Sequence, residues 1–390
     1  MMSLHLNTLV PRVPQHGIRD RLHNNTLALY SPLTRVAKQT PAYLLGPPTR
    51  TPPPFHRLTA AFTTKATLSS SRLHINSREE ASTSSSQERP AFKEECFFRQ
   101  LDPEASAPRE VYFRLVTPVD AAVKRPPVIV IHGGPGIPHD YLNPLETLAV
   151  GEYARPVLFF DQVGCGMSSR PAMATYPYGV EQAVKEVQFA HRELERRGLL
   201  VGSFDDQHGG GVHVYGQSWG GMLAYEWLLE GGKCLSMVLS NSPADVHTVE
   251  RDATKMIDEI EEIDDTTPWG LMHRFFKRHE CSEQENEHLV EAKKKGGAGW
   301  RGTGVLQGWN AMKRAQEKGF SLSDGSRLPV LLIGATKDFV TEDCLNMWRD
   351  VLPEAELNMI QDGTHMPWLE PELKEEYFQV LSHFLASKDS

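Results

Sequence analysis

The sequence predicts an α/β fold: a mostly parallel, twisted sheet with helices on both faces and an inserted all-helical lid. Three observations predict it. Short, mainly apolar runs recur along the chain, as expected of strands that are buried on both faces. These runs are residues 128–131, 157–160, 236–240, 329–333 and 357–360. Helix-forming stretches separate most of them, which indicates βαβ units and parallel pairing. Residues 247–324 interrupt this alternation with helical patterns only.

The basic N-terminal segment, residues 1–92, differs from the rest. Its first 77 residues contain nine Lys and Arg but one acid, Asp20, and many Pro, Ser and Thr. Such a segment cannot bury enough apolar surface to offset its ordering entropy, so we expect disorder. Its composition would suit a mitochondrial presequence, although three early prolines interrupt a long amphipathic helix. Three interpretations of this segment stay open: a plain disordered tail, a transit peptide or an interaction arm. We expect the protein in the cytoplasm, with mitochondria as the alternative.

Bulk composition excludes several classes of protein. The net charge of −9 argues against nucleic-acid binding, and no run of 18 apolar residues predicts a membrane span. The five cysteines are scattered without a C-x-x-C pair, which argues against a disulfide framework or structural zinc and fits a reducing compartment. We therefore expect no metal and no cofactor, and a small molecule or short peptide as the binding partner. The oligomeric state stays open.

The elements follow in order from residue 93. Residues 111–116 alternate as an early antiparallel strand would, and residues 179–197 read as a helix that Gly198 ends. This first part of the core reaches residue 246. The lid follows at 247–324, with helical spacing at 253–263, a helix start near 267, a charged stretch at 283–295, a glycine-rich break at 296–299 and a last short helix around 306–312. The second part of the core, 325–390, ends with a helix at about 371–386.

The candidate nucleophile is Ser218. A predicted strand from residue 212 runs into Gly-Gln-Ser-Trp-Gly at 216–220, and a helix-forming stretch follows. This strand, sharp turn and helix form the context in which a G-x-S-x-G sequence exposes a serine hydroxyl. We call the turn around Ser218 the elbow and the strand before it the elbow strand. Gly216 and Gly220 lack the Cβ atoms that would crowd a strained turn. The helix N-terminus would face the negative charge that develops there. A merely structural tight turn is the alternative.

A serine hydroxyl needs a base, and the base needs an orienting carboxylate. In this type of fold the acid and then the histidine follow the serine along the chain. The last two predicted strands open into loops that carry Asp338 and His365, respectively. Both loops would lie at the carboxyl ends of strands, where such sheets place their sites. We assign Asp338 as the orienting acid and His365 as the general base. Weaker candidates for the acid are Asp362 and Asp343.

Two backbone N–H groups are needed to bind the tetrahedral oxyanion. Trp219 directly follows the candidate nucleophile and should supply one of them. The other should come from the His-Gly-Gly-Pro-Gly loop at 132–136, after an early strand, and Gly134 is our choice. A second glycine-rich stretch at 208–211 directly precedes the elbow strand, so it is expected to be a flexible hairpin or surface loop.

Residues 93 to 388 resemble the α/β-hydrolase family of proline iminopeptidases and L-amino acid amidases. The sequences that carry the resemblance are HGGPG at 132–136, HDY at 139–141, DQVGCGMS at 161–168, GQSWGG at 216–221, LSNSP at 239–243 and HMP at 365–367. The resemblance implies an α/β-hydrolase fold and a serine hydrolase that removes an N-terminal residue, often proline, from short peptides or amino acid amides. In this resemblance Ser218, Asp338 and His365 match the triad, and Gly134 with Trp219 match the oxyanion hole. Asp161 and Gly164 match a motif that shapes the active-site loop.

The lid departs from the family pattern. It looks shorter after His288, and Lys-Lys-Lys-Gly-Gly at 293–297 stands where substrate-facing residues are expected. The family holds the substrate amine with lid carboxylates, and some members have an acid where this chain has Phe339. The lid carboxylates that could serve here are Glu259, Glu261, Glu262, Asp264 and Asp265. An esterase or lactonase on the same scaffold, acting on a small secondary metabolite, is the enzyme alternative. A catalytically inactive binding protein is the non-enzyme alternative.

Overall fold

The computed structural model describes residues 91–389, apart from 105–106, 121–123, 202–210, 264–267, 301–303 and 322–326, and apart from the side chains of 261–263 and 268–269. The predictions for the N-terminal segment up to residue 90 and for residues 208–210 therefore lie outside the described residues. Every helix in the described ranges is too short or too polar to cross a membrane.

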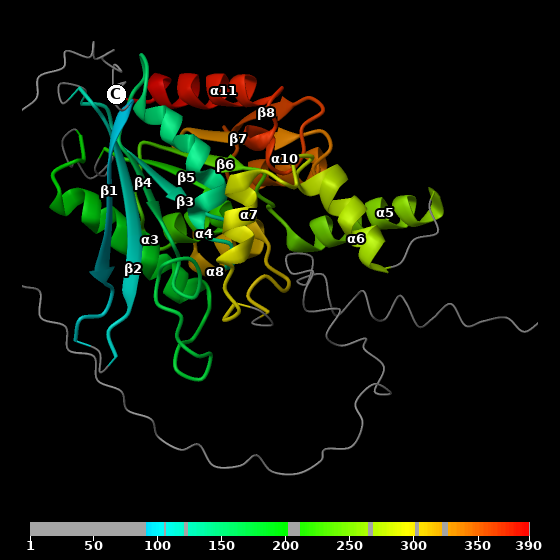
Figure 1. The fold of residues 1–390 in the computed structure, drawn as a ribbon, viewed down its shortest axis with the longest axis horizontal. Coiled ribbons are helices and arrows are strands. Elements are labelled where there is room, and N and C mark those ends of the chain that lie inside the picture. Colours follow the sequence, from blue (N-terminus) through cyan, green and yellow to red (C-terminus); the bar gives the residue numbers. More distant parts are fainter. Residues whose placement is uncertain are drawn as a thin grey trace, which may run out of the picture.

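The described strands form one eight-stranded sheet in the order β1-β2-β4-β3-β5-β6-β7-β8 (Figure 1). The strands are β1 (Phe92–Gln100), β2 (Glu110–Pro118), β3 (Val128–Ile131), β4 (Val157–Phe160), β5 (His213–Gln217), β6 (Ser236–Ser240), β7 (Val330–Ala335) and β8 (Glu356–Ile360). The pairs β1–β2 and β2–β4 are antiparallel, and all later neighbours pair in parallel. The predicted α/β fold class is thus confirmed.

The central strands form where the sequence has continuous apolar runs. Every residue of β3 and β4 is buried, and the same holds for β5, β6 and β7. Strand β1 was not predicted. Most of its residues are exposed and Phe97 is its one buried residue, because it lies at the edge of the sheet and pairs only with β2. Because both faces of β1 are largely exposed, its sequence lacks the alternation of apolar and polar residues that predicts a strand.

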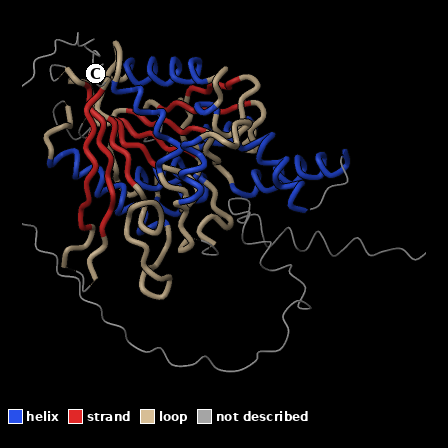
Figure 2. The backbone as a smooth tube through the Cα atoms, in the orientation of Figure 1, coloured by secondary structure: helices blue, strands red, loops and turns tan. Residues whose placement is uncertain are grey.

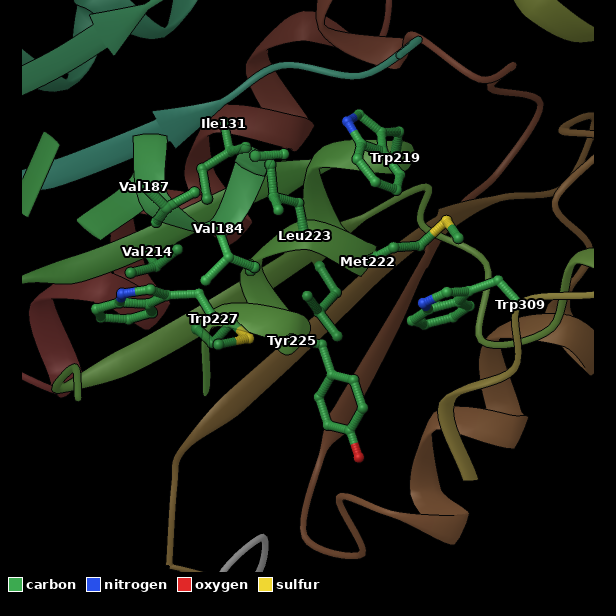
Figure 3. Packing of buried hydrophobic residues seen from close by; sticks show 14 of the residues in the cluster. Ile131, Val184, Val187, Val214, Trp219, Met222, Leu223, Tyr225, Trp227 and Trp309 are labelled. Atoms are coloured by element: carbon green, nitrogen blue, oxygen red, sulfur yellow. The ribbon is translucent and has the colours of Figure 1, made fainter. Parts of the chain in front are cut away.

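Helices cover both faces of the sheet, so that strands lie between helical layers (Figure 2). On one face pack α3 (Val180–Arg196) and α4 (Trp219–Leu229), and on the other pack the 3₁₀ segment η3 (His139–Ala149) and α11 (Lys374–Ser387). Short elements complete the core: α10 (Glu342–Asn346), η5 (Met347–Asp350) and η6 (Pro367–Leu369). Figure 3 shows Leu223 of α4 beside Val184 of α3 and Ile131 of β3, which belong to one buried cluster.

The lid is helical in its described parts, as expected. It contains α5 (Val246–Ile263), α6 (Pro268–Phe275), a π-helical turn η4 (Phe276–Glu280), α7 (Glu287–Lys294) and α8 (Ala311–Lys318). Helices α5 and α6 extend beyond the sheet, whereas α7 packs on η3 and α8 on α4 (Figure 1). The last helix begins later than predicted, because residues 305–308 form a turn and the Asn310 side chain caps α8 by accepting from the Lys313 N–H. The exact division of the chain into core and lid stays a prediction.

Candidate active site

Ser218 occupies a strained turn between β5 and α4. Its φ is +54° and its ψ −121°, a conformation that non-glycine residues rarely adopt. The flanking glycines are required for space. A Cβ on Gly216 would lie 2.3 Å from the Gly220 carbonyl oxygen, and a Cβ on Gly220 would lie 2.1 Å from the Ile131 carbonyl oxygen. The turn therefore has the strained, glycine-flanked backbone expected of the predicted elbow, and Ser218 itself is 4% exposed.

The backbone of this turn is held from β6. The N–H of Ser218 donates to the Ser240 carbonyl oxygen over 2.9 Å, and the Ser242 hydroxyl donates to the Ser218 carbonyl oxygen over 2.8 Å. A Cβ on Gly221 would lie 2.3 Å from the same Ser242 hydroxyl. The close approach of positions 221 and 242 explains why each of them holds a small residue.

Asp338 and His365 form a buried pair. His365 Nδ1 lies 2.8 Å from Oδ1 and 3.0 Å from Oδ2 of Asp338, and each residue is 1% exposed. Two further donors reach the carboxylate: the Val340 N–H at 2.9 Å and the Asn241 side-chain amide at 2.8 Å. The other ring nitrogen of His365, Nε2, is buried and has no hydrogen-bond partner within the described part of the chain. The imidazole is thus oriented at Nδ1 and has an unused nitrogen at Nε2.

The three predicted residues follow β5, β7 and β8 in a sheet where these strands run parallel, so all three lie at its carboxyl edge. Gln217, next to Ser218, donates from its side chain to the His365 carbonyl oxygen over 3.4 Å. This hydrogen bond joins the elbow to the loop after β8 that carries His365, which we call the base loop. The weaker acids do not compete. Asp362 is largely exposed and pairs with Lys337.

The other weaker acid, Asp343, lies exposed in the first turn of α10. Among the predicted acids that the structure describes, Asp338 alone contacts the imidazole. Asp338 and His365 are therefore in contact, and their roles as acid and base stay predictions.

The two predicted oxyanion donors lie on adjoining segments. Gly134 has φ +117°, and a Cβ there would lie 2.6 Å from the N of Gly136, so this position needs glycine. Trp219 is the first residue of α4, where backbone N–H groups have no intrahelical partner. Gln162 joins the two segments: its Oε1 accepts from the Trp219 indole over 2.9 Å, and its Nε2 donates to the His132 carbonyl oxygen over 3.0 Å. The sequence did not single out this role for Gln162.

The ring of His132 is structural. It is fully buried, and its Nε2 accepts the Gln162 N–H over 2.9 Å. Burial lowers the pKa of His132 to about 4, so the ring is neutral at pH 7. Asp161 holds the neighbouring loop, since it accepts from the N–H and Nδ1 of His139 and from the Met167 N–H. Burial alone would raise the pKa of Asp161, but the His139 ring and these hydrogen bonds lower it.

The lid segment at 293–297 packs against the site loops. Lys295 pairs with Asp140 over 2.7 Å, and the Lys295 carbonyl oxygen accepts the Gly166 N–H over 3.0 Å. Gly297 donates from its N–H to the Gly136 carbonyl oxygen over 2.7 Å. A Cβ on Gly297 would lie 1.9 Å from a main-chain oxygen of the 161–168 loop. Lys295 and Gly297, in the lid segment that departs from the family pattern, thus contact both the loop at 132–136 and the loop at 161–168.

The π-helical turn of the lid contacts both loops that carry the acid and base. The His279 carbonyl oxygen accepts the His365 N–H over 3.0 Å, and its Nδ1 lies 2.7 Å from the Lys337 carbonyl oxygen. The ring of Phe339 lies 4.3 Å from the His365 ring between centroids. The lid is therefore part of the structure around the imidazole.

Of the five lid acids predicted to bind a substrate amine, the structure describes the side chain of one. Glu259 is exposed on α5, and the side chains of the other four acids at 261, 262, 264 and 265 lie outside the described residues. Glu280, which sequence reasoning missed, is buried beside the base loop, where its carbonyl oxygen accepts the Thr364 hydroxyl. Its carboxylate pairs with Lys293 over 2.8 Å. No pattern in the sequence distinguished Glu280 from its charged neighbours.

Known proteins resemble this chain over most of its length. A family model described as alpha/beta hydrolase fold matches residues 126–372. The proline iminopeptidase of Lactobacillus delbrueckii subsp. bulgaricus is 30% identical over 306 residues, which cover 72% of this chain and 95% of that protein. The proline iminopeptidase of Clostridioides difficile (strain 630) is 26% identical over 310 residues, 72% of this chain and 96% of that protein. The crystal structure of the proline iminopeptidase from Mycobacterium smegmatis superposes with a TM-score of 0.60 at 25% identity, covering 75% of this chain and 99% of that one.

Proposed function

Because the chain belongs to the α/β-hydrolase family and is related to the proline iminopeptidases, we propose that it is a serine hydrolase that removes N-terminal residues, proline among them, from short peptides or amino acid amides. The observation that carries the proposal is the buried Asp338–His365 pair, which lies at the same edge of the sheet as Ser218 and whose Nε2 has no partner among the described residues. The proposed mechanism uses side chains and backbone N–H groups only, with no metal.

The residues act in two half-reactions. His365 Nε2 takes the proton of Ser218 as Oγ attacks the scissile carbonyl carbon, and Asp338 stabilises the imidazolium through Nδ1–H. The backbone N–H groups of Gly134 and Trp219 donate to the oxyanion of the tetrahedral intermediate. The imidazolium then protonates the leaving amine, which leaves an acyl-enzyme on Oγ. Water, deprotonated by the same Nε2, attacks the ester carbonyl; as the bond to Oγ breaks, Nε2 returns the proton to Oγ, which releases the amino acid and restores the free serine.

The test is a panel of proline, alanine and phenylalanine arylamides compared with short acyl esters. We expect arylamide turnover by the wild type, and fluorophosphonate labelling that disappears in Ser218→Ala. Loss of the nucleophile should lower kcat by about 10⁶-fold, as in other serine hydrolases of this mechanism. A wild type that is not labelled and turns over nothing would refute the enzyme proposal and favour an inactive binding protein.

A second candidate, an esterase or lactonase for a small metabolite, is favoured by one observation. The backbone of Glu280 contacts the loop that carries His365, and the Glu280 carboxylate pairs with Lys293 instead of presenting a free charge for a substrate amine. Turnover of the esters without any arylamide would favour this candidate and refute the peptidase proposal, while leaving the serine mechanism intact.

A further inference from the structure

A chain of buried polar side chains runs beneath the proposed triad. The Tyr215 hydroxyl of β5 lies 2.7 Å from the Tyr377 hydroxyl of α11, which lies 2.8 Å from the Ser240 hydroxyl. Ser240 lies 2.9 Å from Asn241 Oδ1, and Asn241 Nδ2 lies 2.8 Å from Asp338 Oδ2. Four of these residues are 0% exposed and Asp338 is 1% exposed. Four regions of the sequence thus form one chain of hydrogen bonds that ends at the carboxylate.

The number of available protons allows one direction of donation along this row of hydrogen bonds. A carboxylate only accepts, so Asn241 must turn its NH₂ toward Asp338 and its Oδ1 toward Ser240. Because an amide oxygen also only accepts, the Ser240 hydroxyl donates its single proton to Asn241 Oδ1. Ser240 must therefore accept a hydrogen bond from Tyr377. Tyr377 has then used its own proton and must accept from Tyr215. Each hydroxyl thus donates toward Asp338, and hydrogen bonds aligned in this way strengthen one another.

The backbone of Asn241 is held at the end of β6. Its φ is +49°, a left-handed conformation that asparagine tolerates better than most residues. Its N–H donates to the Ile333 carbonyl oxygen of β7 over 2.7 Å, and its Nδ2 lies 3.5 Å from the Thr364 carbonyl oxygen in the base loop. The amide therefore lies between the loops that carry the acid and the base.

We propose that Asn241 is a positioning residue that orients Asp338 toward His365, and that Tyr377, through Ser240, fixes which way the Asn241 amide faces. This inference rests on the proposed serine-hydrolase function. With Asn241 on Oδ2 and the Val340 N–H on Oδ1, the carboxylate has one orientation in which it meets Nδ1. Without the amide donor, the carboxylate rotates, the imidazole loses its alignment, and Ser218 is less often activated.

The first test is Asn241→Gly, because glycine accepts the positive φ and removes only the side chain. We expect kcat to fall by about 10- to 100-fold and KM to stay within about threefold, because a charge-assisted hydrogen bond to the acid is lost and no substrate contact changes. The rate of fluorophosphonate labelling at Ser218 should fall in parallel, since it reports activation of the nucleophile. Unchanged kcat and labelling in a folded variant would overturn the proposal.

The second test is Tyr377→Phe, which keeps the ring and deletes one hydroxyl. Tyr225→Phe is its matched control, since the Tyr225 hydroxyl is also buried but has no hydrogen-bond partner in the described part of the chain. We expect kcat and labelling to fall by about three- to tenfold in Tyr377→Phe, through the loss of one link in the chain, and to stay unchanged in Tyr225→Phe. Equal behaviour of the two phenylalanine variants would overturn the role of Tyr377.

These outcomes separate the inference from the proposed function. If the wild type is labelled at Ser218 and turns over substrate, the function stands, and normal activity of both Asn241→Gly and Tyr377→Phe refutes the positioning role alone. If Asn241→Gly does not fold, Tyr377→Phe and its control decide the question. An unlabelled, inactive wild type refutes the proposed function itself.

Discussion

Replacing Glu186 with glutamine should change how the stability of the fold depends on pH. Glu186 lies on α3 with 0% exposure, and its Oε2 accepts the Val163 N–H over 2.7 Å in the loop that follows β4. Its Oε1 accepts the Tyr176 hydroxyl over 2.7 Å. Burial raises the pKa of Glu186 from 4.5 to about 7, because these two hydrogen bonds compensate only part of the lost hydration.

The sign of the effect follows from the raised pKa. Below pH 4.5 both the folded and the unfolded chain hold the Glu186 proton, and the buried carboxyl costs nothing. As the pH rises toward 7, the unfolded chain loses the proton first, so stability falls. For a shift from 4.5 to about 7, the cost is about 1 kcal/mol at pH 5 and about 3 kcal/mol at pH 8. Stability should therefore fall by about 2 to 3 kcal/mol across this window through Glu186 alone.

Glu186→Gln removes the titration but also perturbs a hydrogen bond. The amide oxygen keeps the Val163 N–H, while its NH₂ faces the Tyr176 hydroxyl, whose proton loses its acceptor. That loss costs about 1 to 3 kcal/mol at every pH. The informative quantity is therefore the change with pH: relative to the wild type, the variant should gain about 2 to 3 kcal/mol between pH 5 and pH 8.

Urea denaturation of both proteins at pH 5, 6, 7 and 8 measures this gain. Glu181→Gln, an exposed position on the same helix, is the control and should follow the wild type at each pH. A free-energy difference between Glu186→Gln and the wild type that stays constant from pH 5 to pH 8 would refute the reasoning, because it would mean that Glu186 titrates alike in both states.

Two further predictions concern packing and charge. Gly220→Ala should destabilise the fold by about 3 kcal/mol and abolish activity, because the new methyl group would lie 2.1 Å from the Ile131 carbonyl oxygen. Thermal unfolding checks it, and Gly179→Ala, whose nearest contact would be 3.7 Å, should cost no more than about 1 kcal/mol, the loss expected for alanine at the N-cap of α3. Asp389→Asn should cost about 3 kcal/mol in urea at pH 7, because it leaves the fully buried Arg155 without its carboxylate. Burial opposes the charge of Asp389, but its hydrogen-bond partners and the charge of Arg155 lower its pKa to about 2, so acid should remove the difference between variant and wild type as the pH falls from about 4 toward 2.

Local patterns carried much of the prediction. The central strands are buried on both faces, so their apolar runs stand out, and the elbow combines a strand, a glycine-flanked serine and a helix within 20 residues. Asp338 and His365 could be assigned because each follows such a strand, in the order that the sheet imposes. Strand β1 escaped prediction because an edge strand with polar residues on both sides has no comparable pattern.

The supports of the site could not be read in the same way. Glu280 and Lys293 lie in a charged region where many pairings are possible, and only the fold selects one. Gln162 belongs to the DQVGCGMS sequence at 161–168, yet its link between the Trp219 indole and the His132 carbonyl depends on how two separate loops approach each other. The same holds for the lid glycines, whose need for space appears only once the loop beneath them is in place.

By itself, the sequence determined the fold class, the elbow at Ser218 and the positions of the acid and base candidates, because these depend on short-range periodicity and on residues next to strand ends. Only the tertiary structure decided how the acid is held. Asn241 lies 97 residues before Asp338, and Tyr377 lies 137 residues after Ser240, so no local pattern relates them. Their hydrogen bonds arise because a parallel sheet brings the ends of distant strands to one edge and α11 packs beneath it, where an unpaired buried hydroxyl or amide would cost free energy.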